Sequence, residues 1–199
     1  MHLYLARHGD SLGSDLCRYG DFGLNDLGRQ QAARLARQLA GVPFTHVYSS
    51  PLKRAAETAQ IVVAERNLAV TVLDDLREVN VGAFDGLTFD QARAQYGWFF
   101  KQSRTRPTLD FRWPEGETTA RVLDRARQTW DRLWQTHQNT DDVLLVISHT
   151  YYLNLFLLAA LGLPFPNRFT FKVELAGCVH VAAEDGLPPW IVFDTPAGE

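Results

Sequence analysis

Short apolar runs alternate with helical patterns along this chain, and no other feature limits its fold as strongly. The runs with the length and composition of strands lie at residues 3–6, 46–49, 70–73 and 143–147. Helical patterns lie between and after them at 28–40, 51–66, 88–96, 119–137 and 151–161. This alternation predicts an α/β fold whose central sheet is mostly parallel.

The last part of the chain predicts strands that join the edge of that sheet in an antiparallel arrangement. Three apolar runs follow the last helical pattern, at 171–175, 179–183 and 190–193. They favour a final antiparallel group. The aromatic stretch 98–114 shows no regular pattern, so we expect it to be irregular. The expected architecture is a three-layer α/β/α sandwich with a mostly parallel central sheet, an antiparallel edge and a small lid insertion.

Length and charge narrow the class of protein. The chain has 199 residues and a formal net charge of −3. The length predicts one domain over 1–199, which can bury enough surface to fold without disulfides or a metal. The acidic balance argues against nucleic acid as a partner, because binding to phosphate backbones needs clustered Lys and Arg side chains. The apolar stretch 143–163 is interrupted by Ser148, His149 and Asn154, which favours a buried strand and helix over a membrane span.

Cysteine usage predicts the compartment. Cys17 and Cys178 form no disulfide framework and lack metal-ligand spacing, which fits a reducing environment. The first residues lack a charged segment followed by a long apolar one, so no secretory signal is expected. We therefore expect a cytoplasmic protein without a membrane partner.

Basic and imidazole side chains follow three of the expected strands. Arg7 and His8 follow the first, Arg54 comes shortly after the second, and His149 follows the fourth. Ligands of open α/β sheets bind beyond the carboxyl ends of the strands, so these side chains are expected to converge there with a helix N-terminus at Ser50. Such a group would bind a polyanion, most naturally a phosphate. Each histidine alone is more often structural, but an arginine at a helix start opposes the helix dipole unless an anion lies close by.

Six motifs stand in order along almost the whole chain. They are 6–11 (ARHGDS), 24–32 (LNDLGRQQA), 48–59 (YSSPLKRAAETA), 76–78 (LRE) with 82–88 (GAFDGLT), 114–118 (PEGET) and 148–150 (SHT). Each motif alone is a weak signal. Together and in this order they resemble the histidine phosphatase superfamily, in its branch 1, phosphoglycerate mutase-like form.

That resemblance implies catalysis through a phosphohistidine. His8 matches the nucleophile that takes the phosphoryl group onto a ring nitrogen, and Glu78 matches the general acid for the leaving alkoxide. Arg7, Arg54 and His149 match the residues that hold the phosphate oxygens. We expect the pocket and the bound phosphate to raise the pKa of Glu78. The arginines argue against a bound cation, so neither a metal nor a cofactor is expected.

Three positions need a separate interpretation. Ser14 stands where many relatives carry an asparagine that touches the phosphate, and its hydroxyl could donate instead. Thr150 replaces the glycine that usually follows the second histidine, and its backbone N–H could still point at phosphate. Neither change removes a catalytic group, so an active enzyme is expected. Glu117 fits a catalytic role and the electrostatics of a helix start equally well, and we favour the structural role.

A lid insertion at 88–115 is expected to set the choice of substrate. Its aromatic part contains Arg104 and Arg106, which would bind further anionic groups of the substrate. Phe22 and Tyr19, in the loop after the first histidine, are expected on the opposite wall. The alternative uses of this aromatic part are a lid packed on the domain and a homodimer contact.

The resemblance leaves three functions open. A phosphatase admits water to the phosphohistidine, whereas a mutase excludes water until the phosphoryl group returns to a second hydroxyl. This chain is compact before its long helix, where glycolytic mutases carry an extra segment, so hydrolysis is favoured. The expected function is that of a metal-independent phosphomonoesterase acting on a small phosphorylated metabolite. The alternatives are cofactor-dependent transfer of the phosphoglycerate mutase type and a non-catalytic module that binds phosphorylated ligands.

Overall fold

The computed structural model describes residues 1–103, 108–165 and 171–192. Its sheet has six strands in the order β3-β2-β4-β1-β5-β6. Their bounds are β1 (His2–Arg7), β2 (His46–Ser49), β3 (Val70–Val72), β4 (Val143–Ser148), β5 (Cys178–Ala182) and β6 (Trp190–Val192). Strands β1 to β4 are parallel, and β5 is antiparallel to both β1 and β6. The mostly parallel sheet with an antiparallel edge is therefore confirmed.

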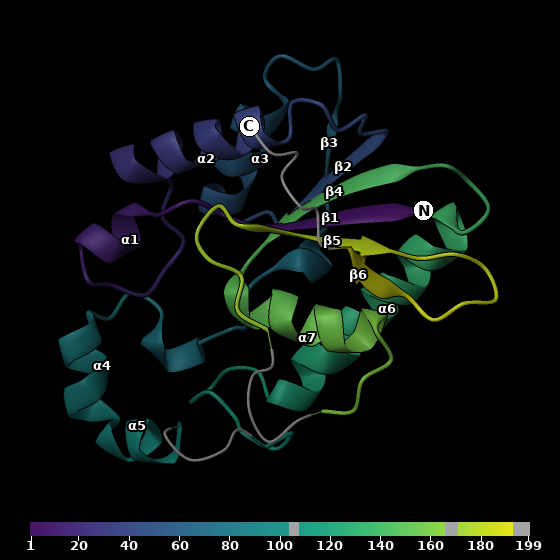
Figure 1. The fold of residues 1–199 in the computed structure, drawn as a ribbon. Helices are drawn as coiled ribbons and strands as arrows, with labels where there is room; N and C mark the ends of the chain where they lie inside the picture. The colour runs from purple at the N-terminus through teal and green to yellow at the C-terminus, as the bar shows by residue number, and fades with distance from the viewer. Residues whose placement is uncertain (104–107, 166–170, 193–199) are drawn as a thin grey trace.

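Helices cover both faces of this sheet. They are α1 (Leu12–Asp15), α2 (Asp26–Gln38), α3 (Lys53–Val63), α4 (Phe89–Gln95), α5 (Gly97–Ser103), α6 (Thr119–His137) and α7 (Thr150–Ala160), with 3₁₀ turns η1 (Asp74–Leu76) and η2 (Gly82–Phe84). Figure 1 shows α2 and α3 on one face and α6 and α7 on the other. Two clusters of buried apolar side chains fill the space between the sheet and each helix pair. This is the expected three-layer arrangement.

The longer helices begin where the sequence offers a capping side chain. The Asn25 side chain accepts a hydrogen bond from the Gly28 N–H (2.8 Å) at the start of α2. The Thr118 hydroxyl accepts from the Arg121 N–H (3.2 Å) at the start of α6, and Thr88 caps α4 in the same way. Each cap gives a partner to a backbone N–H that the helix itself leaves unpaired.

Two expected elements differ from the structure. Helix α3 begins at Lys53 rather than directly after Ser50, because Ser50 closes a separate turn ahead of the helix. The segment 171–175 is not a strand. The Phe171 N–H donates to the side chain of Asn154 (3.0 Å) instead of joining a ladder.

Helices α4 and α5 lie away from the sheet and pack on a small aromatic cluster around Phe84 (Figure 1). The Phe84 ring is fully buried, with its centroid 5.0 Å from those of Tyr96 and Phe99 and 5.4 Å from that of Trp113. Residues 98–103, the first part of the stretch that was expected to be irregular, are helical as part of α5. The packing of Phe99 against Phe84 stabilises this helix, and such packing leaves no periodic pattern in a segment this short.

The apolar stretch 143–163 divides into β4 and α7, as expected. Helix α7 is buried on almost every side because it packs against both the sheet and α6. Among the helices of the described ranges, none combines the length and the apolar character needed to cross a bilayer.

Candidate active site

Parallel pairing of β1 with β4 places the residues that follow these strands side by side. Arg7 is paired with Ser148 in the ladder, and the His8 N–H donates to the Ser148 carbonyl oxygen (3.1 Å). His8 and His149 therefore lie next to each other, with ring centroids 4.9 Å apart. Both stand at the carboxyl edge of the sheet, where α/β folds bind ligands.

His8 has a defined tautomer and no charge. Its Nδ1 lies 2.6 Å from the carbonyl oxygen of Gly9, which can only accept, so Nδ1 carries the proton. The lone pair on Nε2 accepts a hydrogen bond from Arg54 Nε at 3.1 Å. Burial, followed by the charge of Arg54, lowers the pKa of His8 to about 3. A neutral ring with a lone pair on Nε2 is the form that a nucleophilic histidine needs.

His149 is fully buried beside this ring. Its Nε2 lies 2.8 Å from the Ser50 hydroxyl oxygen, which also accepts from the Leu52 N–H (3.2 Å). This arrangement favours donation of the hydroxyl proton to Nε2 and leaves the ring proton on Nδ1. That Nδ1 has no hydrogen-bond partner among the described residues. Burial, followed by the neighbouring His8, lowers the pKa of His149 well below its usual value.

Two arginines flank His8. Arg54 lies in the first turn of α3, where its positive charge is unfavourable next to the positive end of the helix dipole. No acidic residue in that turn compensates for this charge. Arg7 donates through Nη1 to the Val173 carbonyl oxygen (3.3 Å), while its Nε is buried without a partner in the described part of the chain. Burial lowers the pKa of both guanidiniums, and the charge of Glu78 opposes that shift. Both remain cationic and suited to phosphate oxygens.

Glu78 reaches the site from the loop after η1. Its carboxylate accepts hydrogen bonds from the N–H groups of Val79 and Tyr152 (3.1 Å each) and of Tyr151 (3.4 Å). Burial raises the pKa of Glu78, although these hydrogen bonds and the charge of Arg54 oppose the shift. A carboxyl group with a raised pKa keeps its proton nearer to neutral pH, as a general acid requires.

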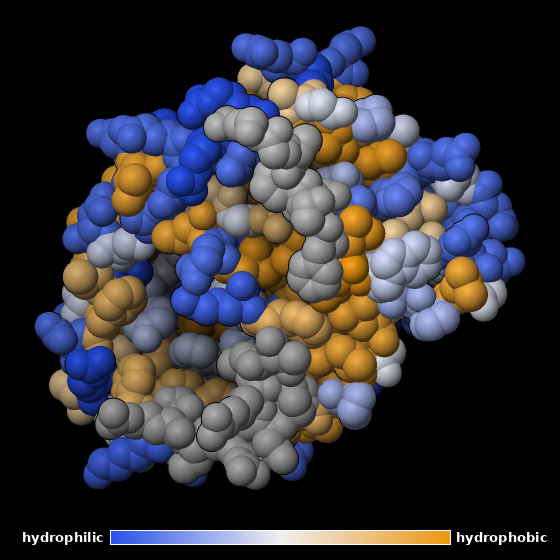
Figure 2. All heavy atoms as spheres, in the orientation of Figure 1, coloured by the Kyte–Doolittle hydropathy of each residue, from blue (hydrophilic) through white to orange (hydrophobic). Residues whose placement is uncertain are grey.

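These groups open into a cavity of about 770 Å³, and Figure 2 shows this face hollowed between α1 and α4. Four of the five expected catalytic side chains line it, whereas His149 lies behind the wall. Ser14 and Thr150 line it too. The Ser14 hydroxyl donates to Asp10 (2.6 Å), so its proton is not turned towards a ligand. Tyr19 forms part of the wall, as does the ring of Trp113.

Other expected binding residues lie elsewhere. Phe22 is not among the described residues that line the cavity, which corrects its expected place on the wall. Its ring packs against Gly13 and Gly20 so closely that a Cβ on Gly20 would lie 2.9 Å from it. Arg104 and Arg106 lie outside the described residues.

The structure also adds residues to which the sequence reasoning gave no role. The Thr58 hydroxyl accepts from the Gly9 N–H (3.1 Å) and so fixes the backbone beside His8. Gly9 must lack a side chain, because a Cβ there would lie 2.5 Å from the carbonyl oxygen of Gly28. The only sequence feature that could have indicated a role for Gly9 and Thr58 is that they lie within the motifs 6–11 and 48–59. Six further polar, non-aromatic residues line the cavity without an expected binding or catalytic role: Ser11, Arg18, Asp21, Arg77, Asn80 and Asp85.

A separate group at the other end of the sheet has the residue types of a metal site. Within the described ranges, ligand atoms of His46, His137 and Asp142 lie within 4.8 Å of one another. Hydrogen bonds already account for the buried member: His137 Nδ1 pairs with Asp142 (2.7 Å) and Nε2 with the Tyr48 hydroxyl (3.0 Å). This group links the starts of β2 and β4 to the end of α6.

At the cavity itself, the positively charged guanidiniums of Arg7 and Arg54 beside His8 would repel a metal cation.

Comparison with known proteins gives consistent results. The model of the family described as histidine phosphatase superfamily (branch 1) matches residues 3–192. A probable phosphoglycerate mutase GpmB of Erwinia tasmaniensis is 27% identical over 195 residues, which cover 96% of this chain and 88% of that protein. Phosphoserine phosphatase 1 of Hydrogenobacter thermophilus is 29% identical over 187 residues, 92% of this chain and 87% of that one. The solved structure of a mycobacterial glucosyl-3-phosphoglycerate phosphatase has a TM-score of 0.83 and 25% identity, with 96% of each chain covered.

Proposed function

The chain belongs to branch 1 of the histidine phosphatase superfamily, and from this we propose that it hydrolyses phosphate monoesters of small metabolites through a phosphohistidine at His8. The observation that carries the proposal is a neutral His8 with its Nε2 lone pair at a cavity that is also lined by two half-buried arginines and by a carboxyl group of raised pKa. The names of the related phosphatases support this reaction class.

In the first step the phosphate of the substrate binds between Arg7 and Arg54. It replaces His8 as the partner of Arg54 Nε, which frees the lone pair on Nε2. Arg7 lines the cavity and its Nε has no partner among the described residues, which supports an oxyanion there, while the unpartnered Nδ1 of His149 lies behind the wall. The Nε2–P bond forms, the P–O bond to the leaving group breaks, and Glu78 gives its proton to the leaving oxygen.

In the second step water attacks the phosphorus of the phosphohistidine. The Glu78 carboxylate, left without its proton by the first step, takes a proton from this water. The Nε2–P bond breaks, its electron pair returns to the ring, and inorganic phosphate leaves. Glu78 is protonated again and His8 is neutral again, so neither step needs a metal or a cofactor.

The rim of the cavity favours hydrolysis over transfer to a second hydroxyl. Arg18, Asp21 and Asp85 line it and are exposed, so water can reach the phosphohistidine. A mutase would have to exclude that water. We propose that the segment 88–115, of which the structure describes 88–103 and 108–115, acts as a lid whose aromatic rings bind the non-phosphate part of the substrate.

Trapping of the intermediate tests the mechanism. The protein is incubated with 4-nitrophenyl phosphate in EDTA, quenched in alkali and examined by mass spectrometry for one phosphoryl group on the peptide that contains His8. Turnover in EDTA together with the labelled peptide is expected, and both should be lost in His8→Ala. Full activity of that variant would refute the mechanism.

The two alternatives are separated by a different assay. Release of inorganic phosphate from 3-phosphoglycerate is followed with and without 2,3-bisphosphoglycerate. Isomerisation that depends on the bisphosphate and far exceeds phosphate release would show a mutase. Binding of phosphate without turnover of any monoester would show a binding module.

The cellular setting is part of the same proposal. Neither Cys17 nor Cys178 forms a disulfide in the part of the chain that the structure describes, which supports the reducing interior of a cell. The small phosphorylated metabolite is the proposed partner. The absence of nucleic-acid and membrane partners, and the homodimer contact, stay predictions.

A further inference from the structure

The proposed acid Glu78 lies on a loop, yet proton transfer requires its carboxyl group to be placed within a fraction of an ångström. The loop follows the short edge strand β3 and the single turn η1. Strand β3 is the edge of the described sheet, so no further strand lies next to the loop to form backbone hydrogen bonds with it. Contacts from elsewhere must therefore hold this loop in place.

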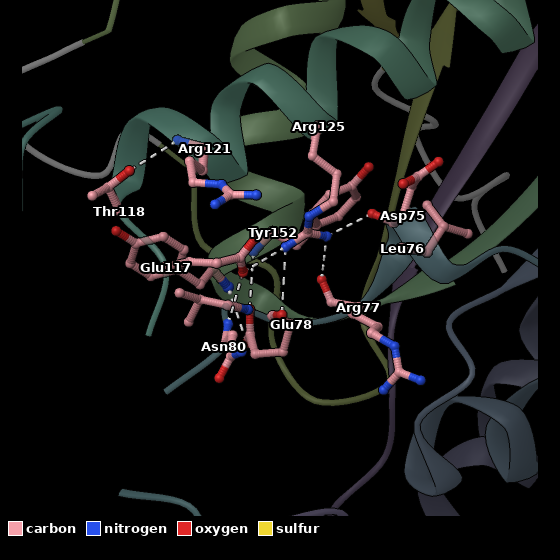
Figure 3. Close-up of polar contacts among 12 residues, drawn as sticks. Asp75, Leu76, Arg77, Glu78, Asn80, Glu117, Thr118, Arg121, Arg125 and Tyr152 are labelled. Atoms are coloured by element: carbon pink, nitrogen blue, oxygen red, sulfur yellow. Dashed lines mark hydrogen bonds and ion pairs between the residues drawn. The ribbon is translucent and has the colours of Figure 1, made fainter. Parts of the chain in front are cut away.

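Ahead of Glu78, the Ser148 hydroxyl donates to the Leu76 carbonyl oxygen (2.7 Å), and Arg125 of α6 supplies two further contacts. Its Nη1 donates to the carbonyl oxygens of Asp75 (2.6 Å) and Arg77 (2.8 Å). Figure 3 shows the guanidinium reaching from α6 into this loop. An Arg side chain suits this role because its rigid fork can satisfy several carbonyl groups at once.

Glu117 extends the same network to the other side of Glu78. Its Oε2 accepts from Arg125 Nη2 at 3.0 Å and from the Asn80 N–H at 2.8 Å. The side chains of Arg125 and Glu117 are only 16% and 20% exposed, so solvent screens this ion pair weakly. The acid is thus held from three residues before it (Asp75) to two residues after it (Asn80). These hydrogen bonds support the structural role favoured for Glu117, at this loop and not at the start of α6.

Arg125 also contacts Tyr152, whose backbone N–H donates a hydrogen bond to the Glu78 carboxylate. The Arg125 guanidinium lies over the ring of Tyr152, 4.9 Å from its centroid. The Tyr152 N–H is a donor to Glu78, and its hydroxyl donates to Thr129 of α6 (3.0 Å). Arg125 therefore fixes both the loop that carries the acid and the helix turn that receives its carboxylate.

We propose that Arg125, paired with Glu117, is the positioning residue for proton transfer by Glu78. The proposal rests on the proposed function, because it assigns a role within that reaction. Arg125 touches neither the substrate nor His8. It acts through the loop at 75–80 and through the first turn of α7.

The test compares two substrates of nearly the same size, phenyl phosphate and 4-nitrophenyl phosphate. Phenolate is a poor leaving group and needs the acid, whereas 4-nitrophenolate leaves with little help. The measured quantity is kcat/KM, which reports the steps up to the phosphohistidine. Arg125→Gln is expected to lower it about 10- to 100-fold for phenyl phosphate and by less than about 3-fold for 4-nitrophenyl phosphate.

Arg132→Gln is the matched control. Arg132 lies on the same helix and pairs with the Asp75 side chain (3.2 Å), but it is half exposed and contacts no backbone group of the loop. It should leave both rates unchanged. Arg125→Lys, which keeps the charge, should recover part of the phenyl phosphate rate.

Equal losses on both substrates, or no loss on either, would overturn the proposal, and so would the same selective loss in Arg132→Gln. If Arg125→Gln does not fold, Arg125→Lys and Glu117→Gln are judged by the same ratio of rates. Failure of the wild-type protein to form phosphohistidine would instead contradict the proposed function, independently of Arg125.

Discussion

Replacing Phe84 by alanine removes the ring on which α4 and α5 are packed. Phe84 is fully buried, and its centroid lies 5.0 Å from those of Tyr96 and Phe99. Truncation of a buried phenylalanine loses its transfer free energy and leaves a cavity, at a cost of about 3–5 kcal/mol. For a chain of this size we expect a fall in Tm of roughly 6–20 °C.

The same substitution should also affect substrate binding. The rings of Tyr19 and Trp113 line the cavity and lie 5.3 and 5.4 Å from Phe84. Their displacement should raise KM for larger esters, while kcat falls less because the groups around His8 do not contact this cluster. Urea unfolding measures the loss of stability in Phe84→Ala, and steady-state kinetics on a panel of phosphomonoesters measures the change in KM.

Trp98→Ala is the control for the stability effect. Trp98 is an aromatic residue of the same segment, but it is 55% exposed, so its truncation should change the free energy of unfolding by less than about 0.5 kcal/mol. A loss below about 1 kcal/mol in Phe84→Ala would refute the inference that this ring anchors α4 and α5.

Two further predictions concern pH. Glu78 must be protonated to act as an acid, and burial raises its pKa, so kcat/KM for phenyl phosphate should fall as pH rises through that value. In Glu78→Gln this alkaline limb should be absent from the pH–rate profile, and its persistence would assign the limb to another group. The hydrogen bond from Thr140 lowers the pKa of Asp142 from 3.8 to about 2, so its contribution to stability is present above the unfolded value and lost as pH falls through the folded one. Asp142→Asn should therefore unfold at lower urea concentration at pH 7, with the gap to wild type closing near pH 2; a gap independent of pH would contradict this.

Several separate contacts hold His8 in the tautomer, charge state and position that nucleophilic attack requires. Its tautomer depends on one carbonyl group, its neutral form on burial and on Arg54, and its backbone on the Thr58 hydroxyl. The contact with Arg54 Nε blocks the lone pair until a phosphate replaces it. Substrate binding and activation of the nucleophile are thereby joined in one exchange of partners.

The order and type of most helices and strands could be predicted from local sequence patterns. Apolar runs of strand length and amphipathic helices are local patterns, so β2 at 46–49 and the end of α6 at His137 could be predicted closely. The arginines and histidines that follow the strands could be proposed for one site because parallel strands end at the same edge. The acid Glu78 came only from a resemblance of motifs, because a loop has no periodicity that shows where it points.

Features that depend on contacts between residues far apart in the sequence became visible only in the folded chain. The register of β1 on β4 sets the 4.9 Å between the two imidazoles, and a slip of one residue would have turned one of them to the other face. The packing around Phe84 made a helix of a segment with no helical pattern. The Phe22 ring packs on two glycines rather than on the cavity wall. Arg125 has no local feature that sets it apart from its neighbours, since its role lies in carbonyl groups about fifty residues away along the chain.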